Sequence, residues 1–201
     1  SAVFWNRCYE PFAIQRDKLI KEHFDNLNVQ SFNSSLLWEP WEIKKSDGSE
    51  YRIFTPYYRK GCLAAPSPNL PVDKPAELKL IKDKGSIYVD SLSLLPKIKW
   101  YKSLEPHWCA GEDNALEAMN RFIDQGLINY KKGRDFPATS YVSRLSPHIH
   151  FGEISIRHLW HTIFSLDNDN DNVDHFLSEL GWREFSYYQL YNHPDLPEKN
   201  L

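Results

Sequence analysis

The sequence lacks the features that mark several common classes of protein. Its three cysteines, Cys8, Cys62 and Cys109, are odd in number and far apart, so the spacing predicts neither a disulfide framework nor a cysteine metal site. No apolar run is long enough to cross a bilayer, and no secretory signal is visible. A glycine-rich phosphate loop, a Walker motif and a Ser-His-Asp elbow are also absent. We therefore expect a cytoplasmic protein whose thiols stay reduced.

The charge and the aromatic content are compatible with a nucleotide-like ligand. The net charge of −3 excludes a generally cationic coat for nucleic acid, although a local basic patch would still bind one. The apolar content of 41% is ample for a core, and 14% of the residues are aromatic, with seven Trp. Surplus aromatic rings suit a core, and they also suit stacking on bases or on a flat cofactor.

The ends of the chain indicate a piece of a longer protein. The sequence begins at Ser1 inside an apolar β-type run without an initiator Met, and it stops at Leu201 without a closing element. Its 201 residues could make one large domain or parts of two.

The N-terminal part predicts an α/β pattern. Residues 2–6 predict a short buried strand, residues 11–28 show helical spacing after Glu10-Pro11, and residues 29–32 predict a second strand. Thr55-Pro56 is typical of an N-cap followed by a first-turn proline, and it predicts a helix over residues 57–62. Strand, helix and strand in this order favour an α/β fold.

A proline-rich linker and a helical part follow. Residues 64–102 are polar, with scattered prolines and little periodicity, which predicts a long linker. Helices are predicted at three places: residues 112–130, residues 156–164 after an N-cap at Ser155, and residues 173–192.

Two acidic or histidine-bearing segments do not predict a metal site. Residues 167–172 resemble the start of a calcium loop, but Asn172 and Ser178 stand where glycine and a bidentate glutamate are required. We expect a solvated loop there, with Asp171 or Asn172 capping the next helix. His148 and His150 flank one residue, and the sequence places no third ligand beside them.

The segment ELGWREF, Glu179 to Phe185, carries the most chemistry. On a helix, Glu179, Trp182 and Arg183 are three and four residues apart, which predicts that they share a face. That face would offer an acceptor, a stacking surface and a guanidinium to a nucleotide-like ligand. The alternative is an amphipathic helix with an internal Glu/Arg pair and Trp182 in the core.

Two upstream segments are possible anion sites. Ser146-Pro147 predicts a helix start beside further hydroxyls and Arg144, an arrangement suited to a phosphate or pyrophosphate. The alternative is a well-capped structural helix. The run Lys131-Lys132-Gly133-Arg134 is compatible with a solvated helix end or with a phosphate contact.

In their order along the chain, these pieces resemble the DNA photolyase and cryptochrome family. The resemblance rests on WNRCYEP with Arg16-Asp17, then FTPYYRKG, YKKGRDFPA, SRLSPHIHFGEIS and ELGWREF, and it covers essentially the whole chain. ELGWREF and LSPHIHFGEIS are most similar to class I cyclobutane pyrimidine dimer photolyases. The resemblance implies the end of a Rossmann-like α/β domain (1–63), a linker (64–102) and the first part of a mainly α-helical FAD-binding domain (103–201).

The family's site residues carry over to matching positions. The resemblance implies FAD as cofactor and, as partner, UV-damaged DNA with a pyrimidine dimer flipped out of the duplex. It implies flavin contacts at Tyr130, Val142, Ser143, Arg144, Leu145, Ser146 and Arg183. It implies DNA contacts at Arg134, Glu179, Leu180, Gly181, Trp182, Arg183, Glu184, Phe185 and Ser186. Glu179 would accept hydrogen bonds from the dimer and Trp182 would stack on it, as the catalytic pair, without a metal.

The chain departs from the family pattern at two positions. Val142 stands where the family usually has a threonine, so one hydroxyl contact to the flavin is lost. Ala13 stands where folate-binding members carry a glutamate, which leaves the antenna as a deazaflavin, another chromophore or none. Because the second half of the family's flavin domain would follow Leu201, we expect that this polypeptide does not hold FAD tightly and is itself inactive, and that the parent protein is a monomer.

Two other functions remain open. A cryptochrome-type photoreceptor would share the fold and FAD but signal instead of repairing. A non-enzymatic nucleic-acid-binding module would bind DNA without preferring damage. Glu179 with Trp182 favours repair, since the resemblance assigns that pair to the lesion.

Overall fold

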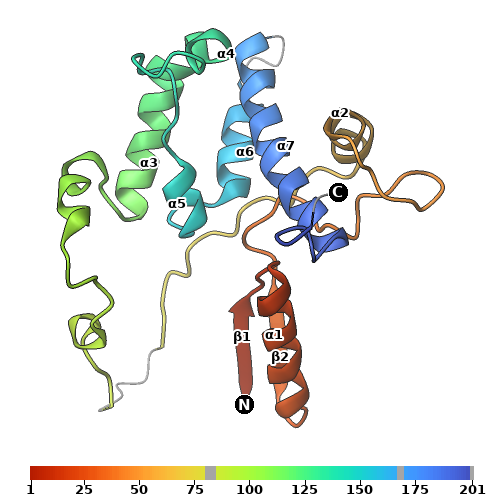
Figure 1. Ribbon diagram of the computed structural model, residues 1–201, viewed down its shortest axis with the longest axis vertical. Coiled ribbons are helices and arrows are strands. Elements are labelled where there is room, and N and C mark those ends of the chain that lie inside the picture. The colour runs from red at the N-terminus through yellow and green to blue at the C-terminus, as the bar shows by residue number, and fades with distance from the viewer. Residues whose placement is uncertain (80–84, 167–169, 200–201) are drawn as a thin grey trace.

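The fold is mainly helical, with a two-stranded parallel sheet at its N-terminus (Figure 1). The structure is a computed structural model that describes residues 1–79, 85–166 and 170–199. Strands β1 (Ala2–Asn6) and β2 (Asn28–Phe32) pair in parallel with Val3 opposite Val29, and helix α1 (Pro11–His23) connects them. The predicted strand–helix–strand order is confirmed.

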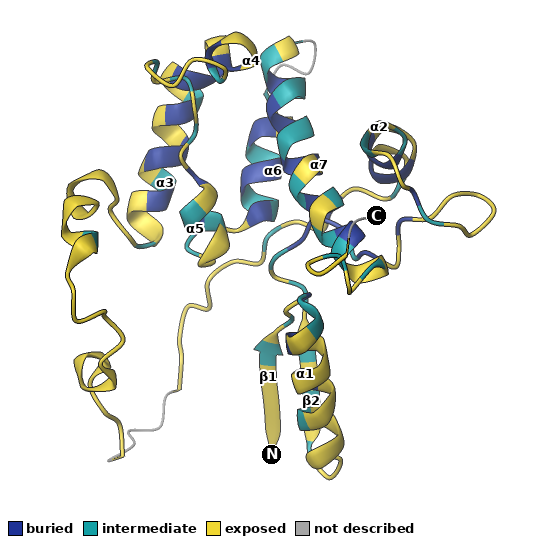
Figure 2. Ribbon diagram, viewed as in Figure 1, coloured by how far each residue is buried: buried dark blue, intermediate teal, exposed yellow. Residues whose placement is uncertain are grey.

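The N-terminal unit projects away from the helical body, and most of its surface is exposed (Figure 2). The prediction of a buried first strand is therefore wrong: in β1 only Trp5 is partly buried, and Phe4 is 57% exposed. Helix α1 begins at Pro11 as predicted but ends at His23, and Phe24 leaves the helical conformation.

The predicted helix at residues 57–62 starts earlier and is less regular. It begins as α2 (Phe54–Pro56), continues as the wider π-helical turn η1 (Tyr57–Gly61), and ends in the tighter 3₁₀ turn η2 (Cys62–Ala64). The residue before the helix is Ile53, and no side chain caps it. The predicted cap at Thr55 is therefore wrong.

The helical part contains four α-helices before the last one. The predicted helix over 112–130 is broken into α3 (Glu112–Arg121), a π-helical turn η6 (Phe122–Gly126), a 3₁₀ turn η7 (Leu127–Asn129) and α4 (Tyr130–Gly133). Helix α5 (Ser146–His150) is short, and α6 (Ile156–Phe164) has the predicted bounds. Ser155 caps α6 as predicted, since its Oγ accepts from the His158 amide at 3.5 Å.

Helix α7 (Asp171–Asn192) carries ELGWREF. Its cap is Asn170, whose side chain accepts from the Asn172 amide at 2.9 Å, so the expected cap at Asp171 or Asn172 is wrong. The calcium-like segment lies partly outside the described residues, because 167–169 are not among them. Within the described part of the chain, no cluster of His, Cys, Asp or Glu side chains could hold a metal ion.

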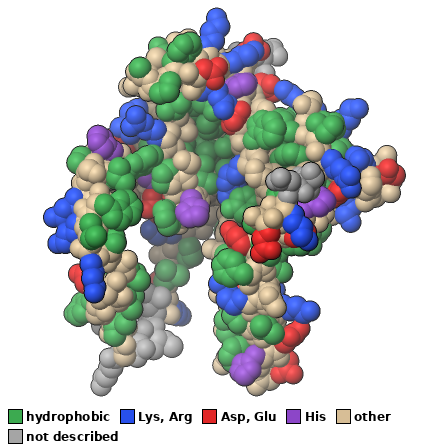
Figure 3. Space-filling view, in the orientation of Figure 1, with side chains coloured by type: hydrophobic (Ala, Val, Ile, Leu, Met, Phe, Trp, Pro, Cys, Tyr) green, Lys and Arg blue, Asp and Glu red, His purple; other side chains and the backbone are tan. Residues whose placement is uncertain are grey.

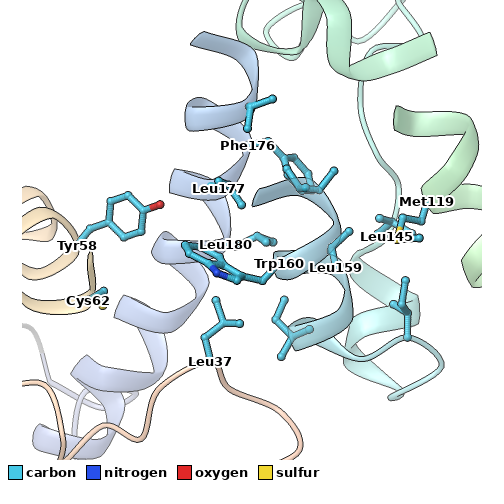
Figure 4. Close-up of a cluster of buried hydrophobic side chains, with 14 of the residues drawn as sticks. Leu37, Tyr58, Cys62, Met119, Leu145, Leu159, Trp160, Phe176, Leu177 and Leu180 are labelled. Atoms are coloured by element: carbon cyan, nitrogen blue, oxygen red, sulfur yellow. The ribbon is translucent and has the colours of Figure 1, made fainter. Parts of the chain in front are cut away.

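One hydrophobic core joins residues 37–62 to the helices (Figure 4). Tyr58 and Cys62 pack on one side of α7, while Trp160 and Leu159 of α6 pack on another. Trp160 meets Trp38 edge to face, with ring centroids 5.3 Å apart. The segment before the linker is thus part of the same core as the helices.

The predicted linker runs over the outside of the molecule. Its described residues hold the 3₁₀ turns η3 (Val89–Leu92), η4 (Trp100–Ser103) and η5 (Glu105–His107), and residues 80–84 are outside the description. The described turns are largely exposed (Figure 2). Across residues 1–79, 85–166 and 170–199, no helix is long and apolar enough to cross a membrane.

Candidate functional site

One side of helix α7 borders a cavity of about 630 Å³. The helix is held there because Phe176, Leu177 and Leu180 bury its apolar side in the core. Three segments line the cavity: α4, the α5 region and α7. Its lining residues are Tyr130, Ser143, Ser146, Pro147, Ile149, His150, Phe176, Glu179, Leu180, Arg183 and Tyr187. The structure thus brings together six of the predicted site residues: Tyr130, Ser143, Ser146, Glu179, Leu180 and Arg183.

Glu179 forms an ion pair with Arg134 inside this neighbourhood. His175 Nε2 lies 4.0 Å from the same carboxylate oxygen. The hydrogen bond to Glu179 holds the pKa of Arg134 above its ordinary value. Arg134 is thus ion-paired with the acid of the site, and its predicted contact with the DNA backbone stays a prediction.

Arg183 presents its guanidinium to the cavity in a fixed orientation. Its Nη1 donates to the Ser35 carbonyl oxygen at 2.6 Å and to Glu184 Oε1 at 3.2 Å. Its Cζ lies 4.9 Å from the centre of the Tyr187 ring. The two hydrogen bonds use only Nη1. Among the described residues, Nε and Nη2 of Arg183 have no hydrogen-bond partner, so they can donate to an anionic ligand.

The SRLS segment is divided between two cavities. Ser143 lines both, while Val142 and Arg144 line a neighbouring cavity of about 540 Å³ together with Arg121. Arg144 has a left-handed backbone with φ of +54°, a conformation that costs energy in a residue with a Cβ. The segment therefore turns sharply between the two cavities.

The details of the α5 start differ from the prediction. Ser146 is the first residue of α5 rather than its cap, and no side chain caps this helix. Leu145 is fully buried and belongs to the core, so its side chain cannot line a flavin site. With only five residues in α5, the predicted helix-terminus contribution to an anion site is weak.

Trp182 stands three residues after Glu179 on α7 and does not line the 630 Å³ cavity. It stacks on Phe54, with ring centroids 3.8 Å apart and an interplanar angle of 13°, and it is 46% exposed. At about 100° per residue, a step of three places the Trp182 side chain about 60° from that of Glu179 around the helix axis. The two side chains are therefore neighbours on α7, but only Glu179 borders the cavity. Arg183, four residues from Glu179, does share the cavity.

Of the other residues in 180–186, some are buried and some are exposed. Leu180, Gly181 and Glu184 are buried, although Leu180 also borders the cavity, so their predicted contacts with DNA stay a prediction. Phe185 is partly buried against Tyr57 and Tyr188. Ser186 is exposed, and its Oγ donates to the Trp182 carbonyl oxygen at 2.9 Å.

Glu184 is a buried acid that anchors the N-terminal segment to α7. Its Oε2 accepts from the amides of Leu37 at 2.8 Å and Trp38 at 3.3 Å. Burial raises the pKa of Glu184 from its ordinary value of 4.5 to about 7, against the opposing effects of Arg183 and the two amides. In the folded protein, the Glu184 carboxyl therefore becomes charged only at about pH 7 and above.

This raised pKa predicts that the protein loses stability as the pH rises. Between pH 4.5 and about 7, native Glu184 keeps a proton that the unfolded chain has released. The native state then binds more protons, so the free energy of unfolding falls through this window, by on the order of 3 kcal/mol in total. Urea unfolding at pH 5 and pH 8 measures it. The Glu184→Gln variant should lack this component, and an unchanged pH dependence in that variant would contradict the assignment.

The sequence analysis did not identify several residues of the site. Ser35 reaches Arg183 across 148 residues of chain separation, and only the fold brings them together. Phe54 was part of the FTPYYRKG motif, but nothing in that motif indicated a stack on Trp182. His175 stands one helical turn before Glu179, and an i,i+4 pairing rule could have found it.

The chain is similar to known DNA photolyases and cryptochromes. The sequence model of the DNA photolyase family matches residues 1–76. The chain is 38% identical over 204 residues to the deoxyribodipyrimidine photo-lyase of Agrobacterium fabrum, covering 98% of this chain and 42% of that protein. It is 31% identical over 215 residues to cryptochrome-1 of Arabidopsis thaliana, covering 100% of this chain and 31% of that protein. The chain spans less than half the length of either relative.

Solved structures agree with the sequence comparison. A bacterial class III photolyase from Agrobacterium tumefaciens matches with a TM-score of 0.90 and 38% identity, over 99% of this chain and 42% of that one. An archaeal photolyase from Sulfolobus tokodaii, solved with two FAD molecules, matches with a TM-score of 0.64 and 26% identity, over 95% and 39% of the two chains. The class III description of the first structure means that the class I resemblance is not confirmed.

Proposed function

Because this chain belongs to the DNA photolyase and cryptochrome family, we propose that it carries part of the flavin- and DNA-binding region of a light-dependent DNA repair enzyme. The reaction is the splitting of cyclobutane pyrimidine dimers. Residues 1–63 are then the end of the Rossmann-like domain, whose residues 37–62 pack into the core of the helical part. Residues 64–102 are the linker and 103–201 the first part of the flavin-binding domain, in a cytoplasmic, monomeric parent protein.

The observation that carries the proposal is the cavity beside α7. It gathers residues of three separate segments, and the family resemblance assigns six of them to the flavin or the lesion. A purely structural role for α4, α5 and α7 would not require hydroxyls, an acid and a guanidinium around one cavity.

The residues present fit a flat, phosphate-bearing group. Ser143, Ser146 and Arg183 supply donors for phosphate oxygens. Tyr130 and Phe176 supply aromatic side chains against which a flat group can pack. When bound and photoexcited in its reduced form, FAD supplies the electron that opens the cyclobutane ring. The chain's own part is to bind and orient, with Arg183 held by Ser35 and Glu184.

Two side chains of α7 are assigned to the lesion. A dimer must leave the duplex to be reached, and flipping costs less for a damaged base that pairs poorly. Trp182 offers an exposed indole for stacking in place of the lost neighbours. Glu179 accepts hydrogen bonds from the polar edge of the pyrimidines, and its ion pair with Arg134 orients the carboxylate until then.

A cryptochrome-type photoreceptor is the second candidate. The 31% identity to Arabidopsis cryptochrome-1 over the whole chain favours it as an alternative. It would share the flavin cavity but would not need the lesion contacts of Glu179 and Trp182.

Lesion binding and light-driven reversal together test the proposal. We expect an oligonucleotide with one thymine dimer to bind more tightly than its undamaged twin. Glu179→Gln should reduce that preference about tenfold, because the neutral amide oxygen of glutamine accepts a weaker hydrogen bond than a carboxylate. Glu77→Gln, at an exposed linker position, serves as the control.

Each failure points to a different function. Flavin reduction in blue light without dimer reversal, in the protein that carries this chain, would support the photoreceptor. DNA affinity with no preference for damage would support the non-enzymatic nucleic-acid-binding module instead.

A further inference from the structure

Three aromatic rings from two distant segments form a parallel stack that ends at the surface. Phe54 stacks on Trp182, and on Tyr58 with ring centroids 5.6 Å apart and an angle of 9°. Tyr58 is 1% exposed and Trp182 is 46% exposed. The stack therefore starts in the interior and ends on a partly open indole.

Gly181 is the residue that allows the inner ring to lie against α7. A Cβ at this position would lie 2.5 Å from Cδ2 of Tyr58, which is too close for any side chain. Figure 4 shows Tyr58 extending toward α7 from the α2–η1 segment. The Tyr58 ring packs against the backbone of Gly181. Phe54 then stacks on Trp182, the residue that follows Gly181 on the helix.

We propose that Phe54 and Tyr58 are positioning residues that hold the indole plane of Trp182, so that its open face takes a pyrimidine base of DNA. The inference rests on the proposed function, in which Trp182 meets the lesion, and adds what fixes it. An indole ordered before the base arrives loses no further rotamer freedom on binding, so more of the stacking energy is retained as affinity.

The surroundings of the stack suit DNA. Lys60 and Arg52 are exposed and lie on either side of Phe54 along the chain, although Arg52 Nε donates to Glu50 Oε1 at 2.9 Å. Figure 3 shows basic side chains beside hydrophobic ones over the α2 region. Basic groups around an exposed aromatic face are typical of surfaces that hold a phosphate backbone while bases stack. Arg59 is less available, since it is bound to Asp174 by two hydrogen bonds of 3.0 and 2.6 Å.

The test measures this chain in the dark with two oligonucleotides of one sequence, with and without a single thymine dimer. Phe54→Leu keeps an apolar side chain but removes the ring, and we expect it to weaken dimer binding about threefold to tenfold with little effect on the undamaged strand. Phe54→Tyr should restore the wild-type affinity. Phe12→Leu, at a position of α1 that is 70% exposed, should change neither.

A second readout follows the indole directly. The near-ultraviolet circular dichroism of Trp182, taken as the difference from Trp182→Phe, should shrink in Phe54→Leu and return in Phe54→Tyr. If Phe54→Leu keeps both the dimer affinity and this signal, the positioning role is overturned while the proposed function stands. If the wild-type chain shows no preference for the dimer and Trp182→Phe changes no affinity, both the proposed function and the inference fail.

Discussion

Replacing Glu184 by alanine is expected to lower the free energy of unfolding by about 3 kcal/mol or more at pH 7. The substitution removes the only acceptor that the structure, over its described residues, gives to the amides of Leu37 and Trp38. Both amides stay buried, and each unpaired buried donor costs about 1–3 kcal/mol. Arg183 also loses its contact of 3.2 Å to the carboxylate.

Glutamine at this position is the matched control for the alanine variant. Its side-chain oxygen can still accept from both amides, so Glu184→Gln should lose less than half as much stability as Glu184→Ala. Urea unfolding followed by far-ultraviolet circular dichroism gives both values. Equal losses in the two variants would show that the carboxyl does not anchor the N-terminal segment to α7.

Replacing Trp160 by alanine is expected to destabilise the protein by about 3–5 kcal/mol. Trp160 is 2% exposed and packs edge to face on Trp38, between α6 and the segment that precedes the linker. The surrounding helices are held by their own contacts and would not close the cavity that the indole leaves. The free energy of unfolding measures the loss.

Phe164 provides the comparison on the same helix. It stacks on Trp160, with ring centroids 6.0 Å apart, but is 44% exposed. Phe164→Ala should therefore cost about 1 kcal/mol, because a smaller apolar area leaves the interior. If both variants lose similar stability, the joint core of α6 and residues 37–62 is not what holds the helical body together.

The sequence predicted regular elements well where local signals agreed. Pro11 set the start of α1, Ser155 capped α6, and the periodicity before Asn192 predicted most of α7. The prediction of one continuous helix was wrong from α3 to α4, where the chain passes through π-helical and 3₁₀ turns. No proline in this stretch indicates the break. Gly126 lies against the ring of Phe122 there, a packing constraint that no spacing rule contains.

The candidate site was predictable in membership but less so in arrangement. The resemblance selected Tyr130, Ser143 and Arg183, and the fold brings them to one cavity. It assigned Glu184 to DNA together with the rest of residues 179–186, whereas the partners of Glu184 are amides 147 and 146 residues away. Such a contact depends on tertiary structure and leaves no local pattern.

The central claim is that the cavity beside α7 is one wall of a flavin site, and a titration of the isotope-labelled chain with FAD tests it most directly. Nuclear magnetic resonance detects even weak binding, residue by residue. The account predicts that signals of Ser143, Ser146 and Arg183 shift together with increasing FAD, and that Arg183→Gln weakens the effect. Shifts confined to another part of the molecule, such as the cavity lined by Arg7 and Trp41, would contradict it.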